Sequence, residues 1–289
     1  MSNSNTNNIY SFIALFNDGY AFRNIFEYLK TEYNDCKFYF KRDSIYMKQL
    51  SQKQDMITEI IINTSDLVQY DFYSDSDFSK GFDVSIMKAA LADVGKKDSV
   101  KFSLLKNDSA FNIQIITPNN HNFDNNAKRI PIKSVDEIKI EMDEFSRKLD
   151  NPNFVWPLSD VSKNCKTISV GCDFISLSLY SKGCKLDKIC GNNSVEHSCK
   201  FGKTDDTLMT GLNSPKINLK VKPLYKLNLK SDNIKNLDKC KNFSVNTNVK
   251  FYFEEIEGAP IRLLIPIGCF GYMIFYGIHI EDIETNKQK

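Results

Sequence analysis

Four side chains that could together bind a metal ion lie within sixteen residues of each other in the second half of the chain. They are Cys184, Cys190, His197 and Cys199. Thiolate and imidazole groups are the usual ligands of structural zinc. The spacing, however, lacks the C-x₂-C knuckle of common zinc fingers. We therefore favour an irregular hairpin with small thiols, and we expect neither a metal nor another cofactor.

Other residues that could support catalysis are sparse. The sequence has three histidines, and none stands beside a plausible nucleophile. It contains neither the phosphate-binding motif G-x-x-x-x-G-K-[ST] nor the zinc-protease motif H-E-x-x-H. The acidic residues Asp75 and Asp77 are explained most simply as part of a loop. We therefore expect that the protein is not an enzyme.

The composition describes a chain long enough for two domains. It has 289 residues, of which 42% are hydrophobic. The formal net charge is +2, to which residues 1–117 contribute −2, residues 118–143 contribute −1 and residues 144–289 contribute +5. The second half therefore has room for a locally basic surface. Without a secretion signal or a long apolar run, we expect a soluble intracellular protein with reduced cysteines.

One pattern of helices and strands occurs twice along the chain. In the first copy, Phe22, Ile25, Phe26 and Leu29 have the spacing of one face of an amphipathic helix. A second helix is predicted over residues 84–94, with Gly95 at its end. Short segments that alternate or are rich in β-branched residues predict strands at 37–41, 44–50, 56–63, 68–73, 100–104 and 111–115.

The second copy has the same order of elements. A helix begins near Pro157, with Leu158, Val161 and Cys165 on one face. The other predicted elements are strands at 167–172 and 175–180, an inserted segment at 184–214, a helix at 232–241, and strands at 249–253, 261–267 and 272–280. The sequence therefore predicts an α+β protein. Its expected parts are an N-terminal domain (1–117), an extended connector (118–143) and a C-terminal domain (144–289).

Three segments are more informative than the overall order of helices and strands. They are the helices at 22–30 and 81–91 and the C-terminal run 259–264, 271–276 and 280–282. In this order they resemble the sliding clamps of the proliferating cell nuclear antigen (PCNA) type, in a divergent form that would suit a large DNA virus. The resemblance spans about residues 22–282. It implies two topologically similar clamp domains, with outer β-sheets and helices on an inner face, in a head-to-tail ring of three subunits.

The resemblance also implies a function: a DNA sliding clamp, or polymerase processivity factor, that encircles duplex DNA and tethers replication and repair proteins. A contact that slides must use long basic side chains on phosphates and must not read bases. The matching residues are Arg23, Lys30, Lys88, Lys163, Lys166, Lys235, Lys239 and Lys241. The alternative is that they are ordinary solvated side chains.

Partner proteins of such clamps, the DNA polymerase among them, use short peptides with aromatic residues, and a clamp loader is a further expected partner. The positions that match the family's peptide pocket are Leu50, Ile130, Pro131, Ile132, Val135, Pro260, Tyr276 and Ile278. An apolar connector is unusual for a loop and is consistent with such a pocket. The alternative is that residues 130–138 pack on their own sheet.

Ring closure requires an edge strand at each end of the subunit. We expect residues 111–116 of one subunit to pair with a strand within 196–203 of the next, with Phe111, Ile113 and Ile115 buried at the contact. Two other functions stay open: a clamp-fold viral transcription or accessory factor that forms no replication ring, and an unrelated α+β interaction protein. The expected location is the nucleus or a cytoplasmic viral replication site, without a membrane.

Overall fold

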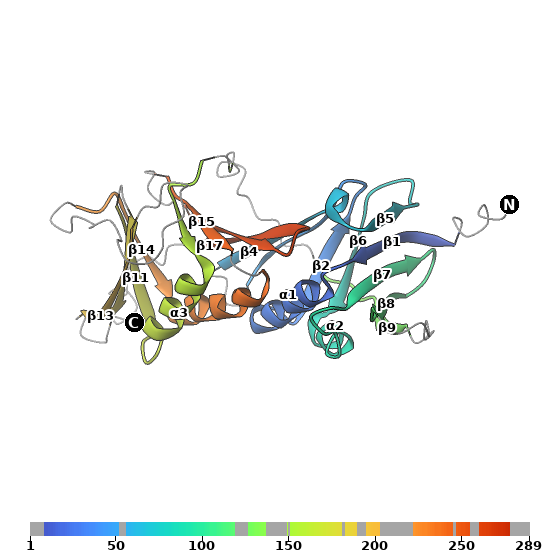
Figure 1. Ribbon diagram of the computed structural model, residues 1–289, viewed down its shortest axis with the longest axis horizontal. Helices are drawn as coiled ribbons and strands as arrows, with labels where there is room; N and C mark the ends of the chain where they lie inside the picture. Colours follow the sequence, from blue (N-terminus) through green and yellow to red (C-terminus); the bar gives the residue numbers. More distant parts are fainter. Residues whose placement is uncertain are drawn as a thin grey trace.

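The structure is a computed structural model of the chain. It describes residues 9–51, 56–118, 127–136, 149, 151–180, 183–189, 195–202, 222–244, 247–254 and 260–277. Figure 1 shows an elongated molecule in which β-sheets form one layer and helices lie along one side of them. Among the described helices, none is long and apolar enough to cross a membrane.

The described strands form three antiparallel sheets. Their bounds in the first half are β1 (Tyr10–Phe16), β2 (Asp35–Phe40), β3 (Ser44–Leu50), β4 (Met56–Asn63), β5 (Gln69–Phe72), β6 (Phe78–Asp83), β7 (Ser99–Leu105), β8 (Ala110–Ile116) and β9 (Lys128–Pro131). In the second half they are β10 (Phe154–Pro157), β11 (Phe174–Tyr180), β12 (Gly183–Ile189), β13 (Val195–Gly202), β14 (Tyr225–Lys230), β15 (Asn248–Tyr252), β16 (Ile261–Ile267) and β17 (Gly271–Gly277). The strand orders are β5-β1-β7-β8-β9, β10-β15-β16-β17-β4-β3-β2-β6 and β13-β12-β11-β14.

Local sequence signals explain where the helices begin. The α1 helix (Gly19–Glu32) starts after Asp18, whose carboxylate accepts a hydrogen bond from the amide of Ala21. The α2 helix (Val84–Ala90) starts after Asp83, which caps it in the same way. In the second half the corresponding helices are α3 (Leu158–Ile168) and α4 (Ser231–Asn236), and α4 continues as a 3₁₀ helix, η4 (Leu237–Asn242).

The two halves of the chain repeat one arrangement of strands. The order β1-β7-β8-β9 in the first half matches β10-β15-β16-β17 in the second. Likewise, β4-β3-β2-β6 matches β13-β12-β11-β14. The two copies therefore have the same topology, as the repeated pattern in the sequence predicts.

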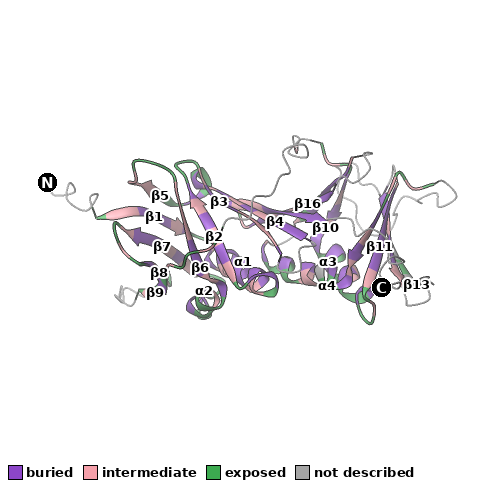
Figure 2. Cartoon of the chain, turned by 180° about the vertical axis from the view of Figure 1, so that it is seen from behind, coloured by how far each residue is buried: buried purple, intermediate pink, exposed green. Residues whose placement is uncertain are grey.

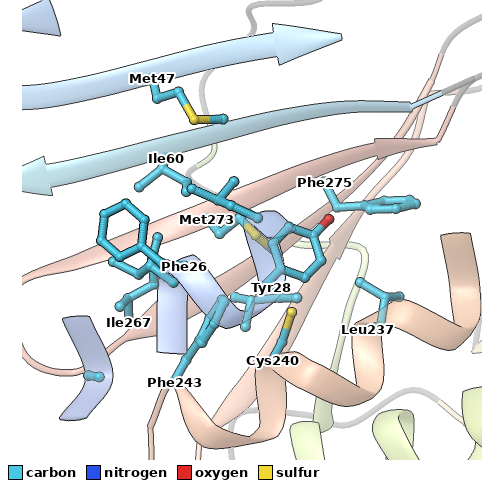
Figure 3. Packing of buried hydrophobic residues seen from close by; sticks show 14 of the residues in the cluster. Phe26, Tyr28, Met47, Ile60, Leu237, Cys240, Phe243, Ile267, Met273 and Phe275 are labelled. Atoms are coloured by element: carbon cyan, nitrogen blue, oxygen red, sulfur yellow. The ribbon is translucent and has the colours of Figure 1, made fainter. Parts of the chain in front are cut away.

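The copies are joined by one strand pair, β17 of the second copy with β4 of the first. The ladder covers seven residue pairs, from Gly271 opposite Ile62 to Gly277 opposite Met56. A side chain at Gly271 would collide with the carbonyl oxygen of Ile61, so only glycine allows this close approach. The hydrophobic core continues across the junction. Figure 3 shows Tyr28 from α1 close to Phe243 and Cys240 from the second half, below Met273 and Phe275 of β17.

The structure differs from the sequence prediction at several segments: β1, β6 and β10 were not predicted, and α2 ends at Ala90 and not at residue 94. Residues 167–172 do not form a strand, because α3 continues to Ile168 and a turn with Gly171 at φ +70° follows. Residues 118–143 are not wholly a connector, because they contain β9, which extends the first sheet beside β8. The first domain therefore extends past residue 117, at least to Pro131. Of the expected insertion at 184–214, the described residues belong to the paired strands β12 and β13, and residues 190–194 and 203–214 lie outside the described residues.

Candidate nucleic-acid interface

The helices of both copies form one continuous layer. The α1 helix packs against α2 on one side and against η4 on the other, and η4 packs against α3. Figure 2 shows the molecule from behind, with α1, α2, α3 and α4 along its lower side. Two hydrogen bonds join the copies within the layer. The amide of Asn24 donates to the carbonyl of Asn242 over 3.1 Å, and the amide of Asn236 donates to the buried carboxylate of Glu32.

All eight basic residues predicted to face DNA lie on the helices of this layer, and each of them is exposed or half-buried. On α3, for example, Val161, Cys165 and Ile168 are buried against the sheets, whereas Lys163 and Lys166 are exposed. The other exposed members are Lys235, Lys239 and Lys241, and the half-buried members are Arg23, Lys30 and Lys88. The helices of the layer carry these eight basic residues and five acidic ones, which leaves a net charge of +3. DNA contact itself stays a prediction.

On the first copy, two of these basic residues are held by a single carboxylate. The ammonium of Lys88 lies 2.8 Å from Glu27, and the guanidinium of Arg23 lies 3.9 Å from it. Arg23 also donates a hydrogen bond to the carbonyl of Val94 over 3.0 Å. These contacts fix α1 to α2, and they occupy charges that the sequence assigns to phosphates. The pattern of basic residues along the chain gives no signal for the role of Glu27.

On the second copy, one carboxylate fixes α3 to η4. The hydroxyl of Ser162 donates to Asp238 over 2.7 Å, and the ammonium of Lys241 lies 3.1 Å from the same carboxylate. Burial alone would raise the pKa of Asp238, but Ser162 and Lys241 outweigh burial, with a smaller contribution from Lys166, and the pKa lies below its ordinary value. In the described part of the chain, Lys163, Lys166, Lys235 and Lys239 form no ion pair.

The face of the central sheet that points away from the helices carries a second apolar cluster, here called the outer patch. Ile57, Ile274 and Tyr276 are buried in it, and Leu50, Leu149, Leu264 and Tyr272 pack against them. Leu50 lies opposite Ile57, which lies opposite Tyr276, so three strands supply one row. The hydroxyl of Tyr276 donates to Glu59, and burial raises the pKa of this phenol. The outer patch therefore lies across the junction of the two copies.

The structure brings together only part of the predicted peptide pocket. Leu50 and Tyr276 meet in the outer patch, and the buried Pro260 precedes β16 beside the end of β17. Ile278 lies outside the described residues. Four pocket residues are elsewhere: Ile130, Pro131, Ile132 and Val135.

These four residues lie in β9 or in the few residues that follow it. Ile130 is buried in the main core, Ile132 packs against that core, and Pro131 is exposed on the sheet edge. Val135 lies against Gly81 of β6. Packing on their own sheet, the alternative reading of the sequence, therefore holds for Ile130 and Ile132. The spacing of Ile130 and Ile132, two residues apart and flanked by Arg129 and Lys133, was a strand signal that Pro131 weakened.

The predicted subunit contact is also corrected. β8 pairs with β7 on one side and, from Ala110 to Ile113, with β9 on the other, so it is not the free edge there. Phe111 and Ile113 are fully buried in the core of their own subunit, and Ile115 packs against that core. On this side, the edge of the sheet is β9. Ion pairs hold β9 and the residues just after it in place: Lys128–Asp93, Arg129–Asp108 and Lys133–Asp35.

The proposed metal ligands are only partly described. Cys184 is buried in the second core, and burial raises the pKa of its thiol. Cys190 and the side chains of His197 and Cys199 lie outside the described residues.

Two copies of one strand–helix unit, joined at a sheet edge with the described α-helices on one face, define a two-domain clamp fold. Models of known protein families give no match, and neither do curated protein sequences. Among solved structures, PCNA from Entamoeba histolytica matches with a TM-score of 0.69 at 13% identity, covering 94% of this chain and 100% of that one.

A chain of the PCNA2–PCNA3 complex from Sulfolobus tokodaii matches with a TM-score of 0.69 at 16% identity, covering 93% of this chain and 100% of that one. The chain therefore has the clamp fold of PCNA, and the predicted fold class is confirmed.

The Asp238 contact predicts a pH-dependent stability. A carboxyl group whose pKa is lowered by folding stabilises the protein above its unfolded pKa, about 4, and this stabilisation is lost as pH falls through the lower folded value. Asp238→Asn should therefore cost about 1 kcal/mol at neutral pH and less in acid. Chemical unfolding at both pH values tests this. The exposed-loop variant Asp75→Asn should show no such change, and an equal loss at both pH values would contradict the assignment.

Proposed function

We propose that the protein is a DNA sliding clamp that acts as a processivity factor and tether and has no catalytic activity of its own. One observation carries the proposal: the strand pair that joins the two copies can be made again between subunits. Inside the chain, β17 of the second copy pairs with β4 of the first. The equivalents of these strands are β9 and β13, and each ends its sheet in the described chain.

Pairing β9 of one subunit with β13 of the next would continue the same arrangement head to tail. Each further subunit adds one internal junction and one external junction of the same kind. Such a head-to-tail series closes into a ring when the rotation from one subunit to the next divides a full turn. Three subunits would give six domains, as the resemblance to PCNA implies. The Sulfolobus tokodaii structure is a complex of two different PCNA chains.

The helix layer is the surface that would face the duplex. In a ring of this kind the sheets lie outside and the layers of all subunits line the hole. The exposed lysines without ion pairs, Lys163, Lys166, Lys235 and Lys239, are the groups best placed for phosphates. No base-reading element is needed, because contacts to phosphate carry no sequence information.

The outer patch supplies a site for partner proteins. Its apolar side chains come from Leu149 and from the strands β3, β4, β16 and β17, and they lie on the face opposite the helices. Aromatic side chains of a short peptide bury a large apolar area on such a surface at low entropic cost. We therefore place the peptide site over the half-buried Leu50, Leu264 and Tyr272, with Ile57 and Tyr276 buried among them, and no longer at residues 130–135.

Encirclement predicts that retention on DNA depends on DNA topology. The protein loaded on a closed circular duplex should remain bound in high salt, and a single cut in the circle should release it. Direct phosphate contacts should weaken steeply with salt, by about 0.9 in log affinity per log salt for each contact. Gel filtration of loaded circles before and after linearisation tests this. Equal loss from intact and cut circles would favour a clamp-fold factor that forms no ring.

The β9 edge predicts a specific assembly defect. The amide of Ile132 donates to the carbonyl of Ser109, so alternation along the ladder turns the backbone N–H of Arg129 away from β8. Arg129→Pro removes that outward donor and should lower the sedimentation coefficient to that of the single chain. Arg129→Ala loses the ion pair with Asp108 but keeps the donor, and it should assemble normally. Equal assembly of both variants would contradict the β9 contact.

The outer patch predicts partner binding by titration calorimetry. A peptide with glutamine followed, a few residues on, by an aliphatic residue and two aromatic residues should bind once per subunit. Its dissociation constant should be on the order of micromolar, because a flexible peptide must be ordered on binding. Leu50→Lys should abolish binding, whereas Val68→Lys, at a distant exposed apolar residue, should not. Absence of saturable heat with the assembled wild type would contradict the assignment.

A further inference from the structure

The first helix of each copy, α1 and α3, can be aligned residue by residue. In α1, Phe22, Phe26 and Leu29 are buried, and in α3 Val161, Cys165 and Ile168 are buried with the same spacing. Aligning these three pairs places Glu27 of the first copy at the position of Lys166 in the second. The same place in the helix layer therefore carries opposite charge in the two halves.

The second helices can be aligned in the same way from their caps. Lys88 is the fifth residue after the α2 cap at Asp83, and Lys235 is the fifth after the α4 cap at Lys230. Both copies therefore present a lysine at this position. What differs is the aligned residue on the first helix: a carboxylate, Glu27, in the first copy and an ammonium, Lys166, in the second.

This difference is accompanied by a difference in the ion pairing and exposure of the lysines. Lys88 forms its 2.8 Å ion pair with Glu27, and the same carboxylate lies 3.9 Å from Arg23. The side chains of Arg23 and Glu27 are each 29% exposed, so the group is partly withdrawn from solvent. Lys235 and Lys166 are exposed, and no ion pair holds either within the described chain. The first copy thus neutralises basic groups that the second leaves available.

We propose that Glu27 withholds Arg23 and Lys88 from DNA, so that the duplex is held mainly by the α3 and η4 surfaces of the second domain. This inference rests on the proposed function. In a ring of alternating first and second domains, phosphate attraction would alternate with near-neutral surface. The duplex would meet three basic patches and not a continuous basic surface around the hole. Fewer contacts to phosphates would then have to break at once when the protein slides.

Charge variants of Glu27 test the proposal through a gain of DNA affinity. The probe is a short fluorescent duplex titrated with the assembled protein at several salt concentrations. Glu27→Gln should free Lys88 and steepen the dependence of log affinity on log salt by about 0.9 for each side chain that reaches a phosphate. Glu27→Lys should steepen it further. Asp75→Asn changes net charge equally but lies in an exposed loop, and it should leave the slope unchanged.

Lysine variants give an independent reading if the Glu27 variants fold poorly. Lys88→Gln should leave the slope of the wild type unchanged, whereas Lys166→Gln should flatten it by about 0.9. Equal flattening by both, or no gain from a folded Glu27→Gln, would overturn the proposal and leave the clamp function intact. Wild-type binding without salt dependence would instead contradict the proposed function.

Discussion

The pairing of β17 with β4 is the interaction on which the rest of the structure depends. It makes one sheet from strands of both copies, and it leaves the equivalent strands β9 and β13 at sheet edges. An exposed edge is a site of association unless it is guarded, and Pro131 at the end of β9 limits its pairing. The fold thus restricts association to a short edge. By analogy with the internal β17–β4 pair, the strand expected to pair with β9 is β13 of another subunit.

The same junction creates the two surfaces that matter for function. On one side it brings α1 beside η4, so that the helices of both copies form a single layer, with Tyr28 and Phe243 in contact beneath it. On the other side it brings Leu50 and Tyr276 together in the outer patch. Opposite faces of one sheet therefore separate the candidate DNA contact from the candidate partner contact. A peptide could bind one while the other faces DNA.

The sequence predicted the parts of the fold that depend on local periodicity. Strands 44–50 and 56–63 and the helix around residues 22–29 follow from alternation and helical spacing, and the structure confirms them. It did not predict β9, because Pro131 and the long flanking segments suggested a connector. Nor could it reveal that Glu27 binds Lys88, because the two residues lie on different helices that only the folded core brings together. The basic residues were found from the family resemblance and from their places on predicted helices, but their availability depends on tertiary contacts.

Native mass spectrometry of the wild-type chain tests the central claim, that the internal junction is repeated between subunits. At micromolar concentration and moderate salt, the account predicts a single closed species with three times the mass of the 33.2 kDa chain. A closed ring leaves no free β9 edge, so larger species should not appear as concentration rises. A chain that stays monomeric at every concentration, or that forms an open series of ever larger assemblies, would contradict the account.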